Sequence, residues 1–143
     1  VSILFDEDYA LLAHVGDSRI YRIRESGIVQ LTEDHSMLND YAKMKGISLE
    51  EAEATLHQGN VVSRALGMKP VVKVDILRIN PGLGDIFLLC TDGLTDLCPD
   101  EQIYQLVMSE RKLDNVCDHL IDAANDAGGK DNITVVLARM EPQ

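Results

Sequence analysis

Residues 86–96 read Ile-Phe-Leu-Leu-Cys-Thr-Asp-Gly-Leu-Thr-Asp. The apolar run at 86–90 predicts a strand that is buried on both faces, and Thr91-Asp92-Gly93 indicates a turn where the chain leaves the core. Asp92 is therefore expected at the rigid end of a core strand, a place where functional sites are commonly built. Gly93 is expected to leave room for a ligand to approach the backbone.

A second acidic turn lies near the C-terminus, where Gly128-Gly129-Lys130-Asp131-Asn132 leads into the apolar run at 133–137. Here the aspartate precedes its strand, whereas Asp92 follows one. Two aspartates at the ends of two core strands can converge on one hard cation, because Mg²⁺ and Mn²⁺ prefer carboxylate oxygens. The sequence therefore makes Asp92 and Asp131 candidate ligands of a metal ion.

The N-terminal part of the chain is rich in β-prone residues. Residues 1–5 and 9–15 predict a hairpin around the polar turn at 6–8, residues 19–24 alternate polar and apolar side chains, and 28–31 form a fourth short strand. We expect these four strands to form one antiparallel meander.

Residues 36–60 differ from their surroundings because they have helical spacing. One helix is expected from Ser36 to Gly46, and Ser48 with Glu51 resembles a capping box that opens a second helix through Leu56. A polar helical insert between strands is typical of a mobile flap, and we predict one at about 36–60.

The second half of the chain predicts a strand at 71–79, the central strand, helices at 101–109 and 113–127, and a last strand at 133–138. Asp100 is expected to cap the first of these helices, and Gly128 is a suitable end for the second. The fold class is therefore α+β, with helices on one face of a mostly antiparallel sheet. The strands are apolar on both faces, which predicts a second sheet that this chain supplies only in part.

Composition restricts the partners. The chain has 143 residues and a net charge of −11, which argues against a nucleic-acid or anionic-membrane surface. There is no apolar run long enough to span a bilayer and no visible signal peptide. The three cysteines lack C-x-x-C spacing, so reduced thiols and a cytoplasmic location are the simplest expectation.

Five short segments stand in a specific order: AHVGDSRIY at 13–21, LTEDHS at 31–36, SRALG at 63–67, TDGLTD at 91–96 and GKDNIT at 129–134. Each is weak alone, because Asp-Gly and Asp-Asn are common turn pairs, but five in one order across 13–137 are specific. Together they resemble the metal-dependent protein phosphatases of the 2C type, and the bacterial branch is the more similar one.

The resemblance implies a four-layer α-β-β-α sandwich and a centre of two Mn²⁺ or Mg²⁺ ions, with a possible third. It implies hydrolysis of phosphoserine and phosphothreonine in phosphoprotein substrates, which are targets of Ser/Thr kinases, by a metal-activated water. By likeness, Asp92 and Asp131 would bind the first ion. Asp17, with Asp92 and Asp96, would bind the weaker third ion, near the flap.

The chain departs from the family at one point. The family's first half carries a phosphate-binding Arg and a D-G-H-G-G segment, whose Asp bridges two ions and whose His is the proposed general acid; neither is present here. The chain also starts without Met, directly in a strand-like pattern. We therefore expect residues 1–143 to be the C-terminal part of a single phosphatase domain, inactive or weakly active alone. Its exposed strand faces predict self-association.

Structural interpretations remain open beside the functional ones. Asp17, Asp92 and Asp131 can be plain turn residues, and Asp96 can cap a turn. The remaining candidates are expected in structural roles: Asp34 as the N-cap of the flap helix, and His14 and His35 as core or turn residues. Arg19 and Arg64 could bind phosphate, but a salt bridge or an exposed position is the expectation for both. The alternative function is a non-catalytic, phosphatase-like module that binds partners or metals.

Overall fold

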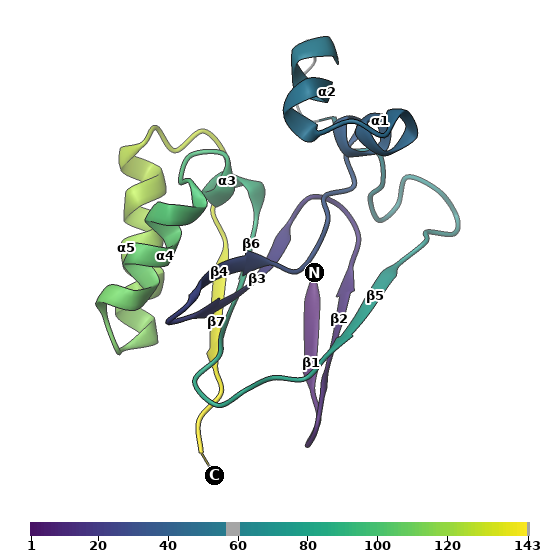
Figure 1. Cartoon of the computed structure of the whole chain (residues 1–143). Coiled ribbons are helices and arrows are strands. Elements are labelled where there is room, and N and C mark those ends of the chain that lie inside the picture. The colour runs from purple at the N-terminus through teal and green to yellow at the C-terminus, as the bar shows by residue number, and fades with distance from the viewer. Residues whose placement is uncertain (57–60, 143) are drawn as a thin grey trace.

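The computed structural model describes residues 1–56 and 61–142, and its strands form two antiparallel sheets (Figure 1). The first sheet has the order β1-β2-β5 and the second the order β4-β3-β6-β7. The strands are β1 (Ser2–Phe5), β2 (Ala10–His14), β3 (Arg19–Arg24), β4 (Gly27–Gln30), β5 (Asp75–Ile79), β6 (Ile86–Cys90) and β7 (Val135–Arg139).

The first hairpin is confirmed, since β1 pairs with β2 from Phe5↔Ala10 to Ser2↔Ala13. The prediction of one four-stranded meander is wrong, because β2 and β3 lie in different sheets. Between them the chain passes through Gly16, whose φ of 107° suits glycine. Ala10 and Leu12 of β2 then pack against Ile20 of β3 across the space between the sheets, which removes more apolar surface from water than a flat meander would.

Helices cover the outer face of the second sheet (Figure 1). They are α3 (Asp92–Thr95), α4 (Asp100–Ser109) and α5 (Leu113–Asp126). Ile103 and Val107 of α4 and Leu120 of α5 are buried against Tyr21 and Leu88 of the sheet. Asp100 is the first residue of α4, and Pro99 takes the N-cap position, one residue before the predicted cap.

The two sheets pack face to face around a second, smaller core, in which the rings of Phe5 and Phe87 meet edge to face at 5.5 Å between centroids. The α+β sandwich is thus confirmed. On the outer face of the first sheet, Leu4 is 66% and Ile76 70% exposed. Residues 1–56 and 61–142 therefore supply three layers, one of helices and two of strands.

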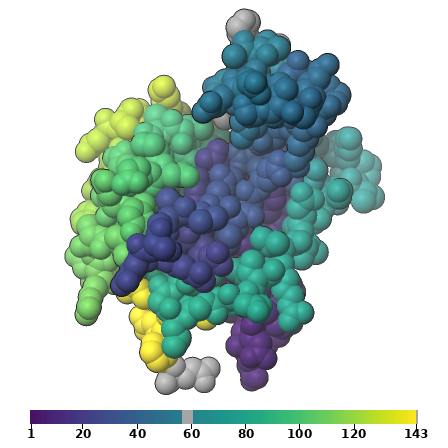
Figure 2. Space-filling view, in the orientation of Figure 1, coloured from purple at the N-terminus to yellow at the C-terminus, as the bar shows by residue number. Residues whose placement is uncertain are grey.

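The predicted flap contains α1 (Met37–Lys45) and α2 (Leu49–Leu56), which form a lobe that projects beyond the sheets (Figure 2). Its local signals are confirmed: Gly46 ends α1 with φ 65°, and Ser48 and Glu51 exchange the hydrogen bonds of a capping box. Residues 57–60 lie outside the described residues. At the base of the lobe, Met37 N–H donates to Val61 O at 2.9 Å.

The structure describes the helices and the environments of the cysteines. In the part of the chain that it describes, no helix is long and apolar enough to cross a membrane. Cys90 and Cys98 are buried free thiols, and burial raises the pKa of Cys90 to about 12. Cys90 therefore contributes to packing as a small buried hydrophobic residue.

Candidate metal site

The register of the central strands brings Asp17 and Asp92 to the same end of the second sheet. Arg19 of β3 pairs with Cys90 of the antiparallel strand β6. Asp17 stands two residues before Arg19, and Asp92 stands two residues after Cys90. In an antiparallel pair, the residues before one strand face the residues after the other, so both aspartates emerge side by side.

The segment that carries Asp131 is held at the same end by hydrogen bonds to Thr91. Thr91 N–H donates to Thr134 O at 3.1 Å, and the Thr91 hydroxyl donates to Asn132 O at 3.1 Å. In return, Thr134 N–H donates to Thr91 Oγ1 at 3.0 Å. These hydrogen bonds hold the turn of Asp92, which follows β6, next to the turn of Asp131, which precedes β7.

Gly93 makes this contact possible. A Cβ at Gly93 would lie 2.3 Å from the carbonyl oxygen of Asn132, a distance that no side chain can occupy. The prediction that Gly93 leaves room for a ligand is therefore wrong, because the space beside it is occupied by the backbone of Asn132. The close approach lets α3 lie directly against the turn of Asp131.

The carboxylates at this end are accessible and locally hydrogen-bonded. Asp92 begins α3 and accepts from Gly93 N–H at 2.9 Å, and Asp131 accepts from Asn132 N–H at 2.7 Å. Asp17 and Asp92 are half-buried, whereas Asp96 and Asp131 are exposed. These bonds fit turn residues, and they also leave the carboxylates within reach of solvent ions.

Negative charge accumulates at this end of the sheet. Desolvation, followed by the neighbouring carboxylates of Asp92, Asp34 and Asp96, raises the pKa of Asp17 above its ordinary value. Partial desolvation and Asp92 likewise raise the pKa of Asp96, which Arg19 only partly offsets. A bound cation would relieve this repulsion.

The residues present fit a hydrated hard cation. All four predicted ligands offer carboxylate oxygens, the donors that Mg²⁺ and Mn²⁺ prefer, and such ions keep several waters. No three of the four come within 4.8 Å of one another in the described part of the chain, where the one group that meets this distance is His14, His35 and Asp75. The site thus gathers the aspartates at one end of the sheet without closing them around an ion.

Asp34 has a different role from the predicted one. The N-cap of α1 is Ser36, which accepts from Asn39 N–H at 3.1 Å. Asp34 instead forms an ion pair with Arg19, with Oδ2 at 2.6 Å from Nη2, and accepts from Gln30 at 2.9 Å. The predicted salt bridge of Arg19 is confirmed. Asp34 neutralises the positive charge of Arg19, which is therefore less able to offset the negative charge of Asp17.

The other polar predictions are confirmed. Arg64 forms a salt bridge with Asp75 at 3.0 Å, and His14 and His35 are each 5% exposed. In the sequence, Asp75 is visible only as a residue of the predicted strand at 71–79. Its partner His35 is 40 residues away in the chain, so no local pattern reveals the pair.

Comparisons with known proteins agree with this fold. The family described as "Protein phosphatase 2C" matches residues 1–133. The serine/threonine phosphatase stp of Listeria monocytogenes serotype 4b is 36% identical over 141 residues, which are 99% of this chain and 56% of that protein. The chain therefore spans little more than half the length of this relative.

Solved structures give the same result. The S. agalactiae serine/threonine phosphatase superposes with a TM-score of 0.87 at 34% identity, over 97% of this chain and 57% of that one. The catalytic domain of the phosphatase PstP, in complex with two manganese ions, superposes with a TM-score of 0.81 at 31% identity, over 98% of this chain and 57% of that one. The family match, the sequence identity and the shared sandwich together show that this chain belongs to the protein phosphatase 2C family of serine/threonine phosphatases.

Proposed function

We propose that this chain is the C-terminal part of a phosphatase domain that hydrolyses phosphoserine and phosphothreonine in proteins with the help of Mn²⁺ or Mg²⁺. Asp92 and Asp131 would hold one ion, and Asp17, with Asp92 and Asp96, a further one. When bound, such ions supply an activated water and positive charge for the phosphate oxygens. The observation that carries the proposal is the contact of Gly93 with Asn132, which joins the two acidic turns at the end where Asp17 emerges.

The chain's own residues keep this end negative and ordered. Arg19, on the strand that follows Asp17, is engaged by Asp34 and so leaves the Asp17 carboxylate available to an external cation. Thr91 bonds to both Asn132 and Thr134, so the two turns do not depend on an ion for their contact. Prearranged ligands of this kind reduce the entropy lost when an ion binds.

In this proposal, the chain carries only some of the residues of the catalytic site. No D-G-H-G-G segment occurs among its 143 residues. The bridging aspartate and the general acid would come from a segment that this chain does not contain, in agreement with its coverage of 56% of the Listeria protein.

The test is hydrolysis of a phosphothreonine peptide with and without Mn²⁺. We expect turnover only from a longer form in which a D-G-H-G-G segment precedes this chain. In that form, Asp92→Asn or Asp131→Asn should lower kcat by about 100-fold or more, since even the loss of residues that only hold the metal ligands in place costs about 10–100-fold. The control is Asp118→Asn, an exposed aspartate of α5, which should leave kcat unchanged.

Two results would contradict the proposal. Equal turnover by this chain alone would show that it carries a complete site. No turnover by either form would favour the non-catalytic module, and calorimetry with Mn²⁺ would then show whether the aspartates still bind an ion.

A further inference from the structure

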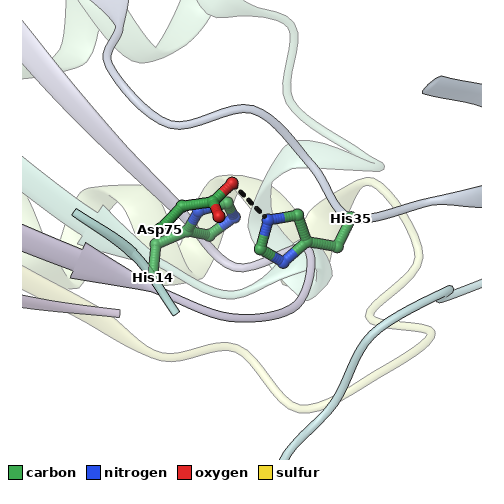
Figure 3. Close-up of side chains that lie close together, drawn as sticks. All are labelled: His14, His35 and Asp75. Carbon is green, nitrogen blue, oxygen red and sulfur yellow. Dashed lines mark hydrogen bonds and ion pairs between the residues drawn. The ribbon is translucent and has the colours of Figure 1, made fainter. Parts of the chain in front are cut away.

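His14, His35 and Asp75 form a compact cluster between the base of the flap and the first sheet (Figure 3). Their ligand atoms all lie within 4.8 Å of one another, and the two imidazole rings are 4.1 Å apart between centroids. His35 Nε2 lies 3.0 Å from Asp75 Oδ2. Two histidines and a carboxylate at such distances are also typical of a transition-metal site, so the hydrogen bonds must decide between the two roles.

The hydrogen bonds favour a structural network. Gly16 N–H donates to His35 Nδ1 at 3.0 Å, and a backbone N–H can only donate, so the proton of His35 is on Nε2 and is donated to Asp75. Arg64 Nη1 lies 2.9 Å from His35 Nε2 and 3.0 Å from Asp75 Oδ1. A guanidinium group thus already stands where a metal ion would have to bind.

The network fixes both polar backbone groups of one residue, Gly16. Its N–H is bound by His35 Nδ1, and its carbonyl oxygen accepts from His35 N–H at 2.8 Å and from His14 Nε2 at 3.0 Å. Gly16 is buried and has a φ of 107°. The next residue is Asp17, so whatever holds Gly16 also sets the direction in which the Asp17 carboxylate leaves the backbone.

His35 is itself held from two sides. The hydrogen bond from His35 is the main cause that lowers the pKa of Asp75. Arg64 forms a second hydrogen bond to the same carboxylate. The carbonyl oxygen of His35 accepts from Ser63 N–H at 2.8 Å, within the ladder at the base of the flap. The imidazole therefore has little freedom to turn away from Gly16.

We propose that His35, oriented by Asp75, is a positioning residue that fixes the Gly16-Asp17 turn so that the Asp17 carboxylate stands beside Asp92. The inference rests on the proposed metal-binding role of Asp17. His35 acts through Gly16 and does not touch the ion or the substrate. Loss of a residue that holds a metal ligand in place typically weakens metal binding by about 10–100-fold.

Two variants of His35 separate the contact with Gly16 from the contact with Asp75. In His35→Asn the side-chain oxygen takes the place of Nδ1 and can still accept from Gly16 N–H. In His35→Gln the amide takes the place of Nε2 and can reach only Asp75. His119→Gln is the matched control, because His119 is exposed on α5.

The first measurement is hydrogen exchange of the Gly16 amide in this chain, followed by NMR. We expect slow exchange in the parent, His35→Asn and His119→Gln, and at least about tenfold faster exchange in His35→Gln. The second is Mn²⁺ affinity by calorimetry, with line broadening at the Asp17 amide as the local readout. Affinity should fall about 10–100-fold in His35→Gln alone.

Each outcome decides a separate statement. Equal exchange at Gly16 in all four proteins overturns the role of His35, and unchanged Mn²⁺ affinity in His35→Gln overturns its link to Asp17. A parent that binds no Mn²⁺ contradicts the proposed function, while the Gly16 exchange rates still decide whether His35 holds the turn. Should both His35 variants fail to fold, Asp75→Ala, which removes the acceptor of the His35 Nε2 proton, replaces them. Faster Gly16 exchange is then expected, and unchanged exchange would contradict the inference.

Discussion

The two ends of the β3–β6 strand pair place aspartates in opposite electrostatic surroundings. At one end, Asp85 is 2% exposed; burial opposes its charge, but bonds from Arg24 and Gly82 N–H outweigh this and lower its pKa. At the other end, desolvation and neighbouring carboxylates raise the pKa values of Asp17 and Asp96. The fold neutralises one end with its own arginine and leaves the other end negative, which is what binding of an external cation requires.

The largest expected effect is at the neutralised end. Asp85→Asn should lower the free energy of unfolding by about 1.5–3 kcal/mol, because it breaks hydrogen bonds between charged groups. The matched change at the other end, Asp17→Asn, should raise stability by less than about 1 kcal/mol, since it removes a repelled and partly exposed charge. Urea unfolding at pH 7 measures both. Equal losses for the two variants would mean that the two ends do not differ.

Gly93→Ala tests how the negative end is built. A Cβ would collide with Asn132 O, so we expect a loss of about 1–3 kcal/mol from the displacement of the neighbouring turn. Gly82→Ala is the control at the opposite end, where the nearest atom is 3.5 Å from the added Cβ and φ is not positive. It should leave stability unchanged or raise it by about 0.4–1 kcal/mol. The same urea titration compares the two variants. Similar losses in the free energy of unfolding would show that the contact of Gly93 with Asn132 has no special importance.

The pH dependence of stability should have opposite signs at the two ends. The folded pKa of Asp85 is lowered, so its stabilisation is present above the ordinary aspartate pKa of 3.8 and is lost as the pH falls through the folded pKa. The folded pKa of Asp17 is raised, so its ionisation is unfavourable at neutral pH and this penalty disappears as the pH falls through the folded pKa towards 3.8.

Unfolding of the parent, Asp85→Asn and Asp17→Asn at pH 7, 5 and 3 checks these signs. The difference in free energy of unfolding between the parent and Asp17→Asn should shrink on acidification from pH 7. The difference between the parent and Asp85→Asn should begin to shrink only below about pH 4. If the free energies of unfolding of the parent and Asp17→Asn differ by the same amount at all three pH values, the charge of Asp17 is not unfavourable in the folded state.

The smallest effect on stability is expected on the exposed face of the first sheet. Leu4→Lys with Ile76→Lys should change the free energy of unfolding by less than about 0.5 kcal/mol, because both side chains are largely exposed. The same pair should suppress self-association of this chain in sedimentation, since an exposed apolar sheet face favours association. Met44→Lys, on the equally exposed flap helix α1, is the control. A parent that is monomeric at all concentrations would contradict the prediction of self-association.

Features with a local physical cause could be predicted from the amino-acid sequence alone. The buried strand at 86–90, the capping box of Ser48 and Glu51 and the end of α1 at Gly46 depend on residues a few positions apart. The same is true of Asp92 and Asp131, because an acidic turn beside an apolar run is visible without knowledge of the neighbours. These elements were predicted correctly, whereas the metal-binding role of the aspartates stays a prediction.

Which distant segments meet became visible only in the folded structure. It placed β2 and β3 in separate sheets, gave Asp34 to Arg19, set Gly93 against Asn132 and joined His35 to Asp75. The contacts that decide these cases, including those of β2 with β5 and of β3 with β6, join segments that are not neighbours in the sequence. Many alternative pairings satisfy the same local preferences. What selects one of them is the simultaneous burial of apolar strand faces and the satisfaction of the polar groups buried with them, and this balance exists only in the assembled fold.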